Sequence, residues 1–258
     1  MTTLPAGAYI SGQGPAIIFL HSSLSTAKQW SPLISILKDK FTCINIDILG
    51  YGNADKVIDE ENYNFDVELK RIRSIIEKSI GEKAYHLVGH SCGGAIALKL
   101  AVEQPKKLLS LSLYEPVAFH LLAKGTAERA EVDSFSFKVA ERSNEKAAQV
   151  FTDFWNNEGF YLSLPAKLQS LMAADMHKVN LDFKGLISEG YQLSDLAVIK
   201  CRATIYSGLQ SPHLSRLLAL QIAKALPNGE LCQLNAGHMG PINQAELVLT
   251  QMAERILS

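Results

Sequence analysis

Short apolar runs alternate with amphipathic segments along most of this chain. The runs are continuous rather than alternating, which is typical of strands covered on both faces, and the segments between them repeat apolar residues near every 3.6 positions. Predicted strands cover residues 16–20, 41–47, 85–88, 108–114, 203–207 and 230–234, and predicted helices cover residues 30–37, 65–80, 91–103, 214–226 and 244–257. Strands that alternate with helices predict an α/β fold with a doubly wound, mostly parallel sheet.

The alternation stops in the middle of the chain. Residues 117–197 have a mostly helical pattern without a convincing strand, and aromatic residues are spread through them. We therefore predict a core of residues 1–116 and 198–258, interrupted by a helical cap of residues 117–197. We expect most cap aromatics to pack against one another, and a minority facing the core to line an apolar pocket.

Composition and charge narrow the possible partners. Of the 258 residues, 47% are hydrophobic and 20% are charged, and the net charge is −1. This balance gives no electrostatic reason to expect nucleic acid or an anionic membrane as a partner. No apolar run is long enough to span a membrane, and the first seven residues lack the basic and apolar segments of a signal peptide.

The cysteines point to a reducing compartment. Cys43, Cys92, Cys201 and Cys232 are scattered, and no pair of them has the spacing of metal ligands. We therefore expect reduced thiols in a cytoplasmic protein, with no metal and no other cofactor.

One stretch carries most of the chemical information. The apolar run at residues 85–88 ends in Gly89-His90-Ser91-Cys92-Gly93, and an apolar helical pattern begins at once. Gly-x-Ser-x-Gly between a strand and a helix is the nucleophile elbow, a turn so sharp that the serine backbone is strained and a Cβ on either glycine would collide with its surroundings. The simpler alternative is an ordinary turn whose serine caps the helix. The strand directly before the motif and the helix directly after it favour a nucleophilic Ser91.

A serine hydroxyl needs a base at neutral pH. His238 is the best candidate, because it lies in a loop of small residues after a late predicted strand, in Asn235-Ala-Gly-His-Met-Gly-Pro241. An exposed loop histidine is the alternative. Five other histidines have simpler explanations. His86 lies in a predicted strand and His90 lies beside the serine, and the remaining three fall in the cap or in a loop: His120, His177 and His213.

These features together resemble the α/β-hydrolase family. The resemblance rests on Phe19-Leu-His-Ser-Ser and Trp30, on Asp47-Ile-Leu-Gly-Tyr-Gly52, on the Ser91 motif and on Gly237-His238, and it covers all of the chain except the detail of the cap. It implies that a nucleophile, an acid and a histidine follow one another in that order along the chain.

The acid is not in the position that the family usually uses, after the penultimate strand. That position holds Ser211, and its loop contains no carboxylate. Some subfamilies, among them certain lipases and haloalkane dehalogenases, take the acid from the strand after the elbow helix, which here ends in Tyr114-Glu115-Pro116. We predict Glu115, with Asp195 as a weaker candidate and Asp47 as a brace for its own loop. A degraded triad, or a Glu115 that only braces its loop, is the alternative.

The resemblance also implies two backbone N–H groups that form an oxyanion hole. Cys92, directly after the nucleophile, is expected to supply one, and Ser23 is expected to supply the other. Ser22 stands where the family usually has glycine. The alternative is that residues 21–25 simply cap the next helix.

These residues predict a serine hydrolase that acts on a small to medium carboxylic ester or thioester with an apolar part. A hydrolase of C–C bonds on the same fold and a ligand-binding protein without activity are the alternatives. A haloalkane dehalogenase is disfavoured, because it needs an aspartate nucleophile and position 91 is serine.

Overall fold

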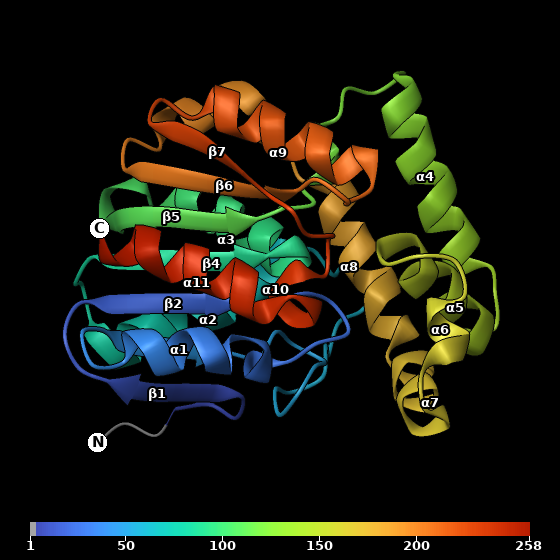
Figure 1. The fold of residues 1–258 in the computed structure, drawn as a ribbon, viewed down its shortest axis with the longest axis horizontal. Helices are drawn as coiled ribbons and strands as arrows, with labels where there is room; N and C mark the ends of the chain where they lie inside the picture. The colour runs from blue at the N-terminus through green and yellow to red at the C-terminus, as the bar shows by residue number, and fades with distance from the viewer. Residues whose placement is uncertain (1–3) are drawn as a thin grey trace.

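One twisted sheet with helices on both faces forms the larger part of the molecule, and a group of helices lies beside one end of it (Figure 1). The computed structural model describes residues 4–258; residues 1–3, part of the segment in which no signal peptide is expected, lie outside the described residues. None of the helices between residues 4 and 258 combines the length and the apolar character needed to cross a bilayer.

The sheet has the strand order β1-β3-β2-β4-β5-β6-β7. All neighbouring strands run parallel except β1, which is antiparallel to β3. Its strands are β1 (Ala8–Gly12), β2 (Ala16–Leu20), β3 (Thr42–Ile46), β4 (Tyr85–His90), β5 (Leu108–Tyr114), β6 (Arg202–Gly208) and β7 (Gly229–Leu234). The predicted doubly wound, mostly parallel fold is therefore confirmed.

Two layers of helices cover the sheet. Side chains of α1 and α11 share one apolar cluster with one face, and side chains of α2, α3 and α9 share another with the opposite face. Alternate residues of β2 divide between them: Ile18 joins the second cluster and Phe19 the first. This is why the strand has a continuous apolar run. The helices are α1 (Ser31–Leu37), α2 (Phe65–Ile80), α3 (Ser91–Glu103), α9 (His213–Ala225), α10 (Gly240–Asn243) and α11 (Ala245–Leu257).

The strand β1 and the helix α10 are among the short elements that were not predicted. The edge strand β1 is largely exposed, with Tyr9 and Ile10 both more than 40% accessible, so it lacks the apolar run of a buried strand. Helix α10 has only four residues, too few to show a helical period. Every predicted strand appears in the structure with ends that differ by at most two residues.

Between β5 and β6 the chain forms helices and no strand within the described residues. They are α4 (Ala127–Ala140), α5 (Asn144–Trp155), α6 (Phe160–Ser163), α7 (Ala166–Ala174) and α8 (Met176–Ser188). We call residues 117–197 the cap, although the division into core and cap stays a prediction. Cap aromatics such as Phe135 and Phe183 belong to the same apolar cluster as the sheet, so the cap rests on the core through a shared interior.

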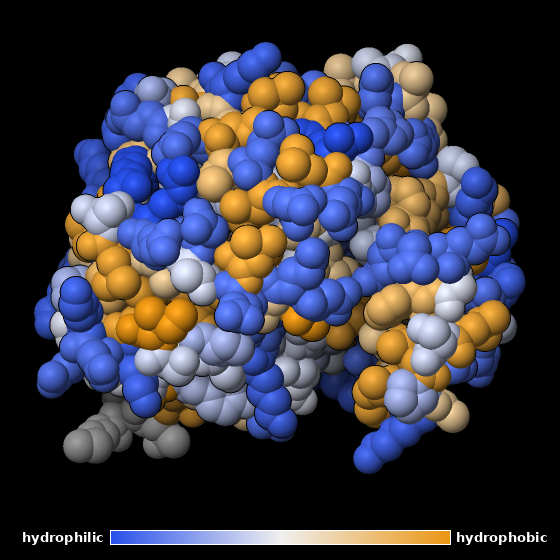
Figure 2. Space-filling model, viewed as in Figure 1, coloured by the Kyte–Doolittle hydropathy of each residue, from blue (hydrophilic) through white to orange (hydrophobic). Residues whose placement is uncertain are grey.

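The surface on the side of α1 and α11 mixes hydrophilic and hydrophobic residues (Figure 2). In the same view the outline is indented between the core and the cap at its lower edge. Orange patches lie over α6 and α7, where Leu162, Leu168 and Leu171 are exposed.

Candidate active site

Ser91 lies at the junction of β4 and α3, at the carboxyl end of the sheet, and its backbone has a φ of 53°. This left-handed conformation is strained for a residue with a side chain. A Cβ on Gly89 would lie 2.8 Å from the Gly93 carbonyl oxygen, and one on Gly93 would collide with the His21 carbonyl oxygen. Both glycines therefore have the steric role that the elbow motif requires.

The structure brings Ser91, His238 and Glu115 into one hydrogen-bonded chain. His238 Nε2 lies 2.9 Å from Ser91 Oγ, and His238 Nδ1 lies 2.7 Å from Glu115 Oε2. The three side chains are more than 90% buried. A carboxylate accepts but does not donate, so Nδ1 carries the proton and Nε2 is left to accept from the serine hydroxyl. This arrangement can activate Ser91 as a nucleophile.

Hydrogen bonds from the end of β6 fix the position of the Glu115 carboxylate. Its Oε1 accepts hydrogen bonds from the Gly208 N–H at 2.7 Å and from Ser207 Oγ at 3.3 Å, and its backbone has a φ of 42°. Ser211, at the usual position of the acid, is buried, and its hydroxyl has no hydrogen-bond partner among residues 4–258. The carboxylate that contacts His238 therefore comes from the end of β5.

The other two candidate acids lie in structural positions. The exposed Asp195 accepts from the Gln192 N–H and so caps the short 3-10 helix Leu193–Val198. Asp47 accepts from the N–H groups of Ala27 at 2.6 Å and Asn53 at 2.9 Å. Asp47 thus braces the loop after its own strand through Asn53, as predicted, and it also holds the segment that contains Ala27.

The two residues predicted for the oxyanion hole lie beside Ser91. Ser23, Ser91 and Cys92 line the same small cavity. Cys92 is the second residue of α3, where a backbone N–H has no acceptor inside the helix. Burial raises the pKa of the Cys92 thiol well above its usual range, so this side chain stays protonated.

A chain of buried polar side chains links the two loops of the site, and sequence reasoning did not find it. Ser22 donates through both its N–H and its hydroxyl to Gln29 Oε1, at 3.2 and 3.0 Å. Gln29 Nε2 lies 3.1 Å from His90 Nδ1, and His90 Nε2 donates to the His238 carbonyl oxygen at 2.9 Å. Ser22, which replaces the usual glycine, therefore uses its hydroxyl to anchor the loop.

The neutral form of His90 suits this chain. Burial lowers the pKa of His90 well below its usual range, and the nearby His238 lowers it further. A neutral ring has one donor and one acceptor nitrogen, and His90 uses both of them. The sequence did show that His90 stands directly before the serine of the motif. It could not show that His90 contacts Gln29, because the two residues are 61 positions apart.

The cavity at Ser91 is small and mostly apolar. Its volume is about 10 Å³, which is room for about one water molecule. Cap residues form most of its wall, among them Phe151, Phe183 and Leu186, together with Val117 and Phe119. The Trp155 ring also lines it and stacks on the His238 ring with 4.0 Å between centroids. A minority of the cap aromatics thus faces the site.

A second polar group missed by sequence reasoning connects the cap to the core beside the cavity. Asp182 of α8 accepts from Ser23 Oγ at 2.6 Å and from the Tyr51 hydroxyl at 2.7 Å, and it pairs with Lys178. The Lys178 ammonium also lies 3.3 Å from Glu68 of α2. Burial by itself lowers the pKa of Lys178, but the two carboxylates together raise it above its usual range.

Ser91, His238 and Glu115 do not line the largest hollow of the described residues. This hollow of about 680 Å³ lies between β1 and α1 and is lined by residues such as Tyr9, Lys38 and Asn53. Within residues 4–258, no group of three or more His, Cys, Asp or Glu side chains is arranged to hold a metal ion. The candidate site is therefore the one built around Ser91.

Comparison with known proteins agrees with this architecture. Solved structures with the same fold include an enol-lactonase from Burkholderia xenovorans LB400, with a TM-score of 0.76, 16% identity and coverage of 98% of this chain and 96% of the other. An esterase from Exiguobacterium antarcticum has a TM-score of 0.78 and 18% identity, with coverage of 97% and 95%.

Sequence comparison gives shorter matches to curated proteins. A fluoroacetate dehalogenase from Burkholderia sp is 28% identical over 129 residues, which are 49% of this chain and 40% of the dehalogenase, so less than two-thirds of that relative is matched. A model of the alpha/beta hydrolase fold family matches residues 15–194. The chain belongs to the alpha/beta hydrolase fold family, and this membership supports a hydrolase as its general activity.

Proposed function

We propose that the protein is a serine hydrolase that cleaves a small to medium carboxylic ester or thioester through an acyl-enzyme on Ser91. The observation that carries this proposal is the hydrogen-bonded chain from Ser91 through His238 to Glu115, with distances of 2.9 and 2.7 Å. His238 takes the serine proton as Ser91 Oγ attacks the carbonyl carbon, and Glu115 stabilises the imidazolium that forms.

In the proposed mechanism the N–H groups of Cys92 and Ser23 hold the oxygen that becomes negative during the attack. Their position beside Ser91 in the cavity supports this role, as does the start of α3, whose N–H groups favour a developing negative charge. His238 then gives its proton to the leaving alcohol or thiol. A water molecule, activated by His238, releases the acid from Ser91 and restores the enzyme.

The size and lining of the cavity favour a short acyl group. About 10 Å³ enclosed mostly by apolar side chains leaves little room for a long chain without movement of the cap. We therefore propose acetyl to butyryl esters as first substrates. The four free cysteines, three of them buried, fit a reducing compartment, and we place the activity in the cytoplasm as part of this proposal.

The similarity to a dehalogenase does not carry over to this site. Displacement of a halide by a carboxylate gives an ester, which water can open. Displacement by the Ser91 hydroxyl would give an ether, which does not hydrolyse under the same conditions. Ester chemistry is therefore the better match to a serine nucleophile.

A fluorophosphonate probe tests the nucleophile directly. We expect the wild-type protein to be labelled and Ser91→Ala to be unlabelled, with a loss of p-nitrophenyl acetate hydrolysis of at least about 10³-fold. Undiminished labelling of the alanine variant, or no labelling of the wild type, would contradict the proposal. Tight ligand binding without labelling or turnover would instead indicate a binding protein.

A further inference from the structure

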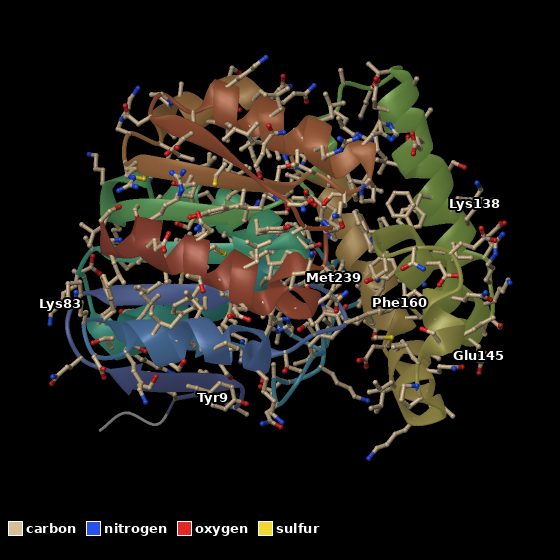
Figure 3. The ribbon with its side chains drawn as sticks, viewed as in Figure 1. Tyr9, Lys83, Lys138, Glu145, Phe160 and Met239 are labelled. Atoms are coloured by element: carbon tan, nitrogen blue, oxygen red, sulfur yellow. The ribbon has the colours of Figure 1, made fainter. Side chains whose placement is uncertain are left out.

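A second hollow lies directly beside the candidate active site, at the junction of cap and core. Its volume is about 300 Å³. Trp155 and Phe160 line it from the cap, and Met239 and Gly237 line it from the loop that carries His238. Phe160 and Met239 are labelled in Figure 3, where they lie close to the junction of cap and core. We call this hollow the amide groove, for the side chains described below.

Trp155 forms part of the wall of both the amide groove and the small cavity at Ser91. Its ring stacks on the His238 ring at 4.0 Å between centroids, with 29° between the planes. The groove therefore lies next to the Trp155 ring that covers His238. Ser23 and Cys92 line the small cavity instead, together with its apolar wall.

In the proposed reaction, the small cavity and the amide groove contact different halves of the substrate. The carbonyl oxygen of the acyl half must face Cys92 and Ser23. When the acyl–oxygen bond breaks, its electron pair goes to the leaving oxygen, which takes the proton from His238 Nε2. The alcohol half therefore leaves on the side of His238, and the amide groove adjoins His238 through Gly237, Met239 and the Trp155 ring.

The chemistry of the groove selects for a particular alcohol. Five amide side chains line it, from Asn156, Asn157, Gln210, Asn243 and Gln244, and no charged residue of the described chain is among its lining residues. The oxygens Asn157 Oδ1, Gln210 Oε1 and Asn243 Oδ1 accept no hydrogen bond from any residue within 4–258. Free acceptors next to amide N–H donors match hydroxyl groups, which both donate and accept.

The remaining lining residues fit the same kind of ligand. Phe160 and Met239 are partly exposed and offer apolar surface to the carbon atoms between hydroxyl groups. We propose that the amide groove binds the alcohol half of the substrate, and that this half is an uncharged polyhydroxylated alcohol such as glycerol or a sugar. This inference rests on the proposed serine hydrolase function.

A set of acetate esters with different alcohols tests the inference. We would compare kcat/KM for 1-acetylglycerol, propyl acetate and acetylcholine, since the first two leaving groups have the same carbon skeleton. We expect 1-acetylglycerol to exceed both of the other esters by about tenfold, the effect of one or two hydrogen bonds. A 6-O-acetylated methyl glucoside, measured in parallel, distinguishes a sugar from glycerol as the preferred polyol.

Substitutions of groove residues test whether the preference for 1-acetylglycerol arises in the amide groove. The exposed pair Asn157→Leu and Gln210→Leu, combined in one variant, removes two of the free acceptors without touching the buried interior. We expect the ratio of kcat/KM for 1-acetylglycerol to that for propyl acetate to fall about tenfold. The matched control combines Asn144→Leu and Gln13→Leu, both exposed and outside the groove, and should keep the preference.

The outcomes separate the two proposals. Labelling by fluorophosphonate together with equal kcat/KM for 1-acetylglycerol and propyl acetate would overturn the groove assignment and leave the serine hydrolase proposal intact. A higher value for acetylcholine would also overturn it, because a cation finds no carboxylate among the lining residues. Absence of labelling would remove the serine hydrolase proposal, and the groove assignment with it.

Discussion

The carboxylate of Glu115 lies 2.7 Å from Nδ1 of His238, although the two residues are 123 positions apart in the chain. Glu115 follows β5 and His238 follows β7, with β6 between them in the sheet. All three strands are parallel, so both loops open at the same carboxyl edge. The length of a glutamate side chain suits a carboxylate that must reach across the intervening strand, and Gly208 at the end of β6 donates to it on the way.

Glu115→Gln is expected to lower kcat by about 10³- to 10⁴-fold, because an amide can donate to Nδ1 and so favour the wrong tautomer of His238. Ester hydrolysis and thermal unfolding should be measured together, to separate chemistry from folding. Asp195→Asn is the control, since Asp195 only caps a short helix, and it should keep full activity. Loss of activity by orders of magnitude in the Asp195 variant alone would contradict the assignment.

Gln29→Leu should weaken the link between the loops that carry Ser22 and His238. The variant leaves the Ser22 donors and His90 Nδ1 buried without their partner. Each such group costs about 1–3 kcal/mol, so we expect the free energy of unfolding in urea to fall by at least about 2 kcal/mol. We also expect kcat to fall about tenfold through misplacement of the site. The exposed Gln13→Leu should change neither quantity.

Phe151→Ala is expected to shift the preferred acyl chain toward longer esters, because Phe151 forms part of the wall of the small cavity. A series of p-nitrophenyl esters from acetate to decanoate gives the measurement. Phe137→Ala removes an aromatic ring from the cap that is 60% exposed and outside the cavity, so its chain-length profile should match that of the wild type. An unchanged profile in the Phe151 variant would mean that other residues limit acyl length.

Lys178→Met should destabilise the protein by about 3–5 kcal/mol, because it leaves the carboxylates of Asp182 and Glu68 buried without their cation. Urea denaturation measures the change. Lys184→Met, an exposed position on the same helix, should stay within about 0.5 kcal/mol of the wild type. Equal effects of the two substitutions would show that the buried ion pairs do not fasten the cap to the core.

His120 makes stability depend on pH. Burial lowers the pKa of His120 to about 4, and the charges of Lys99 and Arg129 act in the same direction. An ordinary histidine in the unfolded chain has a pKa of about 6.5. The unfolded state therefore binds more protons between these two values, so the contribution of His120 to stability is lost as pH falls from about 6.5 to about 4.

His120→Leu should remove this loss, so the free energy of unfolding of the variant should rise relative to the wild type as pH falls from 7.5 to 4.5. We expect a relative gain of a few kcal/mol, which is the free energy that corresponds to the difference between the two pKa values. Chemical denaturation at several pH values gives the comparison. Gln13→Leu replaces an exposed residue without a titratable group and should follow the wild-type curve in parallel. Parallel curves for both variants would contradict the role of His120.

Much of the fold could be predicted from local pattern. Continuous apolar runs such as residues 16–20 are dictated by burial on both faces, and the Gly-x-Ser-x-Gly turn is dictated by local backbone sterics. The loop of Ser211 contains no carboxylate, and the resemblance to α/β-hydrolase subfamilies that take the acid from the strand after the elbow helix pointed to Glu115. The predictions of strands and of the turn depend only on residues that are close together in the sequence.

The tertiary structure decided what depends on distant residues. The link from Ser22 through Gln29 to His90, and the ion pairs of Lys178 with Asp182 and Glu68, join elements whose spatial neighbours no local pattern reveals. The edge strand β1 was missed because exposure removes the apolar signal that identifies a buried strand. The sequence by itself determined that Ser91 stands on a sharp turn at a sheet edge. Only the packing of β5, β6 and β7 determined that Glu115 meets His238 there, because hydrogen bonds depend on distances in space and not on separation along the chain.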